Sequence, residues 1–273
     1  MRDPLESFRP ADGLDSRRSS PHGRAAFRAP PGRLIDSVRP ATNDARFSVG
    51  AAVAVWVGAY VAALPLQAAV IAAFGRNGDD PDTWPTSVTA VSILCLWIPF
   101  VAGLIIISRR RGGTSFARDY RVGFRPIDLA GLPIGLAAQF VLVPLLYWPL
   151  SNLFPGAFDP DDVERRANEL WDRASGAWIL VLVLIVAIGA PLIEEFVYRG
   201  LILQSLEGRF NDAISLVLSA AWFAAIHLQP VELPGLFLVG LVFGSCWQRT
   251  GRIAMPILAH IGFNAAGLLI ASR

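Results

Sequence analysis

Long apolar runs separated by short polar segments dominate the chain from residue 47 onward. Most of these runs are close to the ~20 residues that cross a ~30 Å hydrocarbon core as an α-helix. They cover residues 47–74, 86–108, 127–150, 176–203, 212–228, 232–248 and 252–270. We therefore predict an all-α fold, a polytopic membrane helix bundle of seven or eight transmembrane helices over residues 47–273.

Composition separates this bundle from the segment that precedes it. The chain is 53% hydrophobic and 17% charged, which excludes an ordinary soluble domain. Residues 1–46 are rich in Arg, Pro, Ser and Asp and lack apolar periodicity, so we predict a disordered tail there. This tail mixes acids with its arginines and carries no recognisable binding motif, so no nucleic-acid partner is expected.

The basic residues indicate how the bundle lies in the bilayer. Arginines are concentrated in the tail and again between Arg109 and Arg125, whereas the loop around Asp79 is acidic. The positive-inside rule places both Arg-rich regions on the cytoplasmic side. We therefore expect a multi-pass protein of the cell membrane, in contact with the lipid bilayer and with a cytoplasmic N-terminus.

A few polar side chains interrupt the apolar runs near the C-terminus, and ionisable groups at membrane depth are candidates for function. They are Glu194, Glu195, Arg199, His227, His260 and Asn264. Glu195 and Arg199 are four residues apart and can pair on one helix face. Glu194 points elsewhere and is suited to proton transfer. A structural alternative is that the acids mark a helix end, and that His and Asn join helices by hydrogen bonds.

Taken together, these groups match what peptide-bond hydrolysis needs. A carboxylate can activate water, and imidazole or amide groups can stabilise the oxyanion. His227, His260 and Glu194 are also a candidate three-ligand zinc site with an open position for water. The spacing alone leaves both chemistries open.

Three motifs resemble those of the CPBP family, which comprises the CAAX proteases and bacteriocin-processing enzymes and is also called the ABI family. In chain order they are Glu194-Glu195-x-x-x-Arg199, Phe223-x-x-x-His227 and His260-x-x-x-Asn264. The resemblance covers about residues 120–270 and implies an intramembrane endopeptidase, with an eight-helix bundle and a catalytic cavity open toward the cytosol.

Carried over residue by residue, the resemblance implies that Glu194 and His227 activate water and that His260 and Asn264 stabilise the oxyanion. Glu195, Arg199 and Phe223 would support the site. The family is described both as metalloproteases and as glutamate-dependent enzymes, so zinc stays a candidate cofactor. The expected substrate is a peptide or membrane protein. The alternatives are a non-catalytic bacteriocin-immunity or scaffold protein and, third, a transporter.

Overall fold

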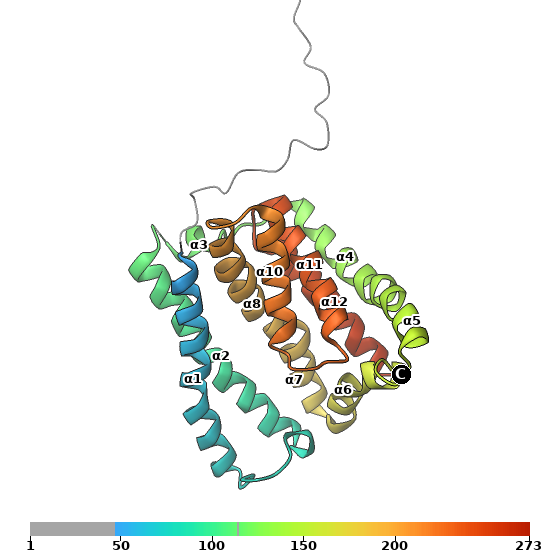
Figure 1. Cartoon of the computed structure of the whole chain (residues 1–273). Coiled ribbons are helices and arrows are strands. Elements are labelled where there is room, and N and C mark those ends of the chain that lie inside the picture. The colour runs from blue at the N-terminus through green and yellow to red at the C-terminus, as the bar shows by residue number, and fades with distance from the viewer. Residues whose placement is uncertain (1–46, 114) are drawn as a thin grey trace, which may run out of the picture. The chain divides into compact units, whose positions relative to one another are not determined.

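The structure is a computed structural model that describes residues 47–113 and 115–273, and these residues form helices and connecting loops without a strand. Figure 1 shows α1 and α2 at one edge of the bundle, α4 and α5 at the other, and the motif-bearing helices between them. The helices are α1 (Val49–Ala73), η1 (Pro81–Thr83), α2 (Thr86–Arg111), α3 (Phe116–Asp119), η2 (Pro126–Ala130), α4 (Gly131–Ala137), η3 (Ala138–Leu142), α5 (Val143–Leu153), α6 (Pro160–Arg173), α7 (Ala177–Val183), η4 (Leu184–Gly189), α8 (Ala190–Glu195), η5 (Phe196–Leu203), α9 (Gln204–Glu207), α10 (Asp212–Ala225), α11 (Leu233–Thr250) and α12 (Ala254–Ala271).

The prediction of a polytopic helical bundle is confirmed. Within the described residues, five stretches are long and apolar enough to cross a membrane: Val49–Ala73, Thr86–Arg111, Pro126–Leu153, Ala177–Glu207 and Ala254–Ala271. α10 and α11 lie among them in the bundle. The tail predicted at residues 1–46 lies outside the described residues.

Small residues let neighbouring helices approach closely, as is common inside membranes. A Cβ atom at Gly131 or Gly135 of α4 would collide with the backbone of α12, and one at Gly262 would collide with the Leu132 carbonyl of α4. On α11, a Cβ at Gly240 would lie 3.1 Å from the backbone of Ala220. α12 and α11 are therefore held against α4 and α10 at backbone contact distance, which fixes the helices that carry the polar motifs.

A salt bridge anchors the start of α12. Arg252 donates from Nε and Nη2 to the two carboxylate oxygens of Asp128, at 3.0 and 2.7 Å. Such a two-point contact is stronger and more directional than a single ion pair. The hydrogen bond to Asp128 raises the pKa of the Arg252 guanidinium above its usual value. The loop before α12 is thus tied to the segment that begins the third span.

Candidate active site

The two adjacent acids lie on α8, in the middle of the long span from Ala177 to Glu207. π-helical segments flank α8 on both sides, η4 before it and η5 after it. Short π-helical segments inside α-helices occur frequently at functional sites, where they interrupt the regular 3.6-residue period. Pro191 at the start of α8 has no N–H, so one carbonyl of the preceding turn loses its helical donor.

Glu195 is the centre of a fully buried cluster. Its Oε1 atom accepts one hydrogen bond from Arg199 Nη1 and another from His260 Nδ1, each at 2.8 Å. The Glu195 and Arg199 side chains have no exposed surface. Because a carboxylate accepts hydrogen bonds only, the proton between His260 and Glu195 belongs to Nδ1 of the imidazole. The ion pair expected from the four-residue spacing is present, and α12 adds a histidine to it.

The Arg199 guanidinium lies between two aromatic rings. Its central carbon is 4.9 Å from the centre of the Phe223 ring and 5.4 Å from that of Phe243. Its Nη2 atom donates to the Gly240 carbonyl at 2.9 Å. Contacts between cations and aromatic rings are strongest where water is excluded. Phe223 and Phe243 therefore help Glu195 to stabilise a charge that water does not reach.

His227 follows α10 closely. Its Nδ1 atom lies 2.7 Å from the Phe223 carbonyl oxygen, which can only accept, so Nδ1 carries a proton and Nε2 is the free nitrogen of the neutral ring. The next residue, Leu228, has a φ of 54°, a left-handed conformation that is unusual for a bulky side chain. The imidazole therefore lies in the turn that follows the helix, two residues after its last residue, Ala225.

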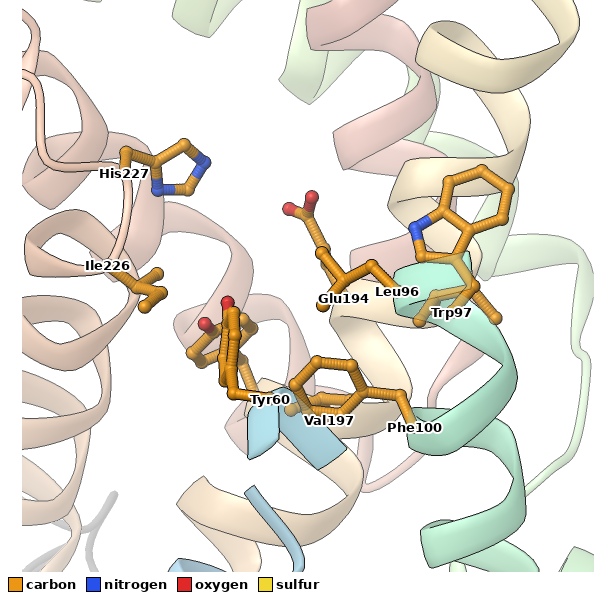
Figure 2. A pocket seen from close by; sticks show the side chains of 10 residues that line it. Tyr60, Leu96, Trp97, Phe100, Glu194, Val197, Ile226 and His227 are labelled. Atoms are coloured by element: carbon orange, nitrogen blue, oxygen red, sulfur yellow. The ribbon is translucent and has the colours of Figure 1, made fainter. Parts of the chain in front are cut away.

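Glu194 and His227 line the same cavity, whose volume is about 190 Å³. Figure 2 shows the Glu194 carboxylate and the His227 ring reaching into this space from opposite sides. The Glu194 side chain is 28% exposed, in contrast to its fully buried neighbour. Tyr60, Trp97 and other apolar or aromatic side chains form the remaining walls. The cavity thus holds a carboxylate and an imidazole in largely apolar surroundings.

His260 lies between the two acids but does not line the cavity. While Nδ1 is bound to Glu195, Nε2 is 3.8 Å from Oε2 of Glu194, which is longer than a hydrogen bond. The ring is held by stacking on Phe243, with centroids 4.6 Å apart. His260 is therefore oriented by Glu195 and directs its second nitrogen toward Glu194.

Asn264 is bound to the backbone of the long span. Its Nδ2 atom donates to the Val186 carbonyl at 2.8 Å. In the π pattern of this segment Ala190 N–H donates to the Ile185 carbonyl, so the donor for Val186 would come from residue 191, which is proline. Asn264 thus replaces the N–H that Pro191 lacks, and its amide is not part of the cavity wall.

Comparisons with known proteins agree with this architecture. The family described as Type II CAAX prenyl endopeptidase Rce1-like matches residues 176–266. An uncharacterized 24.3 kDa protein of Escherichia coli is 32% identical over 151 residues, which are 52% of this chain and 70% of that protein. The chain belongs to the Rce1-like family. This is a family of membrane proteases, and the matched residues include all three polar motifs.

Another relative in the comparisons has an activity in its name. The membrane-embedded CAAX protease MroQ of Staphylococcus aureus (strain USA300) is 30% identical over 89 residues, which are 30% of this chain and 36% of MroQ. The chain therefore spans about a third of that relative. No solved structure matches the chain.

The sequence interpretation missed several walls of the cavity in this Rce1-like chain. Tyr60 comes from α1, and Trp97 and Phe100 come from α2, far outside the matched stretch. Nothing in the local sequence distinguishes an aromatic residue that lines a cavity from other aromatic residues of an apolar helix. Phe243 was missed as well, although the spacing of Gly240 and Gly244 on the same helix is a pattern of closely packed membrane helices.

The predicted zinc ligands do not converge in this arrangement. Within the described residues, no three His, Cys, Asp or Glu side chains are grouped so that they could hold a metal ion. His260 directs Nδ1 to Glu195, and its Nε2 is 3.8 Å from Glu194. The donor set as it stands does not fit a three-ligand site.

Proposed function

We propose that this Rce1-like chain hydrolyses peptide bonds inside the membrane, with Glu194 as the general base. The observation that supports this most directly is the shared cavity of Glu194 and His227 beside a buried, charge-balanced cluster. A carboxylate in a largely apolar cavity can take a proton from water, and the imidazole opposite can hold that water through its free Nε2. Water then attacks the scissile carbonyl.

His260 and Asn264 are proposed to stabilise the oxyanion of the tetrahedral intermediate. His260 would donate from Nε2 while Nδ1 stays on Glu195, which requires a doubly protonated ring whose positive charge faces the oxyanion. Asn264 would have to turn its amide from the Val186 carbonyl toward the substrate oxygen. Collapse of the intermediate breaks the C–N bond, and the proton held by Glu194 passes to the leaving amine, so that one carboxylic acid and one amine are released.

Glu195, Arg199 and Phe223 are proposed to support the site without touching the substrate. Glu195 orients His260, Arg199 neutralises Glu195, and Phe223 contacts both the guanidinium and the His227 ring, at 5.0 Å between ring centres for the latter. The substrate class that fits is a peptide or membrane-protein segment with an apolar side chain next to the scissile bond, because the cavity walls are apolar and aromatic.

The test is peptidase activity of the detergent-purified protein on a peptide library, read by mass spectrometry. Wild type is compared with Glu194→Gln and with the matched control Glu169→Gln, which changes a half-exposed glutamate of α6 outside the cavity. Cleavage by wild type and control but not by Glu194→Gln is expected. Equal cleavage by all three would refute the role of Glu194. Loss of the protein itself in Glu194→Gln would favour the scaffold alternative.

A further inference from the structure

The two ends of the bundle differ in charge. One end holds the loops after α2, α9 and α11, and nine of the 15 arginines in residues 47–273 lie there. They are Arg109, Arg110, Arg111, Arg118, Arg121, Arg125, Arg209, Arg249 and Arg252. The other end holds the acidic loop at residues 75–85 and the acidic helix α6. Because arginines in short loops stay in the cytoplasm, the Arg-rich end is the cytoplasmic one.

The loop that carries His227 belongs to the opposite half of the bilayer. α10 starts next to the exposed Arg209 at the Arg-rich end and has 14 residues, which rise ~21 Å of the ~30 Å hydrocarbon thickness. Its last turn therefore lies past the bilayer centre. In Figure 1 the loop between α10 and α11 lies toward the same end of the bundle as the loop between α1 and α2, but it does not extend as far.

The side of the cavity facing the Arg-rich end is closed by buried residues. Arg199 follows Glu194 on the span that leads to this end, and Phe223 precedes His227 on the helix that comes from it. Arg199 and Phe223 are 0% and 1% exposed, and Phe243 beside them is 0% exposed. Both cavity residues thus lie one helical turn farther from the cytoplasm than this sealed layer.

The loop on the side of the cavity that faces the other end is partly exposed. Leu228, directly after His227, is 81% exposed, and Gln229 and Pro230 are exposed as well. Residues 226–232 are not helical, and non-helical backbone at membrane depth is tolerated only within protein or beside water. Because Leu228, Gln229 and Pro230 are exposed rather than packed, their peptide groups need water, which reaches them over the shorter path from the end opposite the arginines.

We propose that the cavity opens to the non-cytoplasmic face and takes exported peptides, or membrane-protein segments that end there. The reaction in this proposal rests on the proposed peptidase function, whereas the direction in which the cavity opens does not. It reverses the cytosolic opening that the family resemblance implies. The substrate reaches Glu194 between the hairpin of α1 and α2, which supplies Tyr60 and Trp97, and the loop after His227.

Cysteine labelling tests the direction without any activity. In a cysteine-free background made by Cys95→Ser and Cys246→Ser, single cysteines replace Gln229 beside the cavity, Asn77 between α1 and α2, or Val122 at the Arg-rich end. Intact cells are treated with a membrane-impermeant maleimide. Gln229→Cys and Asn77→Cys are expected to react equally, and Val122→Cys only after permeabilisation. Two results would overturn the proposal. One is labelling of Gln229→Cys only after permeabilisation, as for Val122→Cys, and the other is no labelling of Gln229→Cys in either condition.

Sealed vesicles test the same point with the unmodified protein. The probe is a membrane-impermeant quenched peptide that the detergent-purified enzyme cleaves. Right-side-out vesicles are expected to cleave it, inverted vesicles only after detergent is added, and Glu194→Gln vesicles not at all. Cleavage by sealed inverted vesicles alone would overturn the proposal. If no peptide is cleaved even in detergent, the peptidase function fails, and the labelling still decides the direction.

Discussion

The hydrogen bond from Asn264 to the Val186 carbonyl offers a way to separate a structural role of this asparagine from a catalytic one. Asn264 donates where Pro191 cannot. A proline-to-alanine change would restore a backbone N–H at position 191, which could then donate to Val186 itself. The informative set is therefore Asn264→Ala, Pro191→Ala and the double variant, compared with wild type.

The expected magnitudes follow from the local bonding. Interhelical hydrogen bonds in membranes contribute about 0.6 kcal/mol on average and up to about 1.7. A buried carbonyl left without a donor costs about 1–3 kcal/mol. We expect Asn264→Ala to lower the free energy of unfolding by about 1–2 kcal/mol in the Pro191 background. In the Pro191→Ala background most of this cost should vanish, which is a coupling energy of about 1 kcal/mol.

Two readouts are needed on the same four proteins, thermal unfolding in detergent and peptidase kcat/KM. If Asn264 also binds the oxyanion, the double variant regains stability but stays as inactive as Asn264→Ala. Asn152→Ala is the matched control, because Asn152 also donates to a helical carbonyl, that of Trp148 at 2.6 Å, but on an exposed turn. It should change neither readout.

Two results would refute this reasoning at different points. Additive losses of stability in the double variant would mean that Asn264 does not substitute for the missing N–H of Pro191. Recovery of kcat/KM together with stability would mean that Asn264 acts only through the helix, and its assignment to the oxyanion would be wrong.

Other variants test the remaining parts of the site. Glu195→Gln should cost about 3–5 kcal/mol of stability by leaving Arg199 buried and unpaired, whereas Glu194→Gln should remove activity and spare the melting temperature; equal melting losses would contradict this division. Gly189→Ala should push the Trp97 ring into the cavity and raise KM, and adding Trp97→Ala should return KM to its original value. Unchanged kinetics in Gly189→Ala would show that Trp97 does not form a wall of the substrate site. A zinc chelator should leave kcat unchanged if Glu194 acts without metal, and loss of activity that zinc reverses would show the opposite.

The sequence predicted those features that depend on local spacing. Five of the seven apolar runs correspond to stretches long and apolar enough to cross a membrane, and the four-residue interval between Glu195 and Arg199 predicted their ion pair. Contacts between helices that are distant in the sequence could not be predicted, because helical periodicity contains no information on which helix faces meet. The hydrogen bond between His260 and Glu195 joins residues 65 positions apart and is of this kind.

The π-helical segments explain a second gap between sequence and structure. A regular helix of 3.6 residues per turn predicts the direction of each side chain, but η4 and η5 interrupt that period on both sides of α8. The interruption also frees the Val186 carbonyl that binds Asn264. A motif that the sequence presents as a histidine and an asparagine on one helix face therefore serves two different parts of the long span.

Adjacent positions on one helix give the two acids opposite environments. A step of ~100° per residue separates them, so one can face the helices α11 and α12 while the other faces α1 and α2. Glu195 meets Arg199 and His260 and has no exposed surface, and Glu194 meets the cavity and is 28% exposed. Glu195 is thus bound through Oε1 to a cation and an imidazole, whereas Glu194 has no such cation beside it. This difference supports the proposal that Glu194, the acid without a cation of its own, is the general base beside the sealed pair.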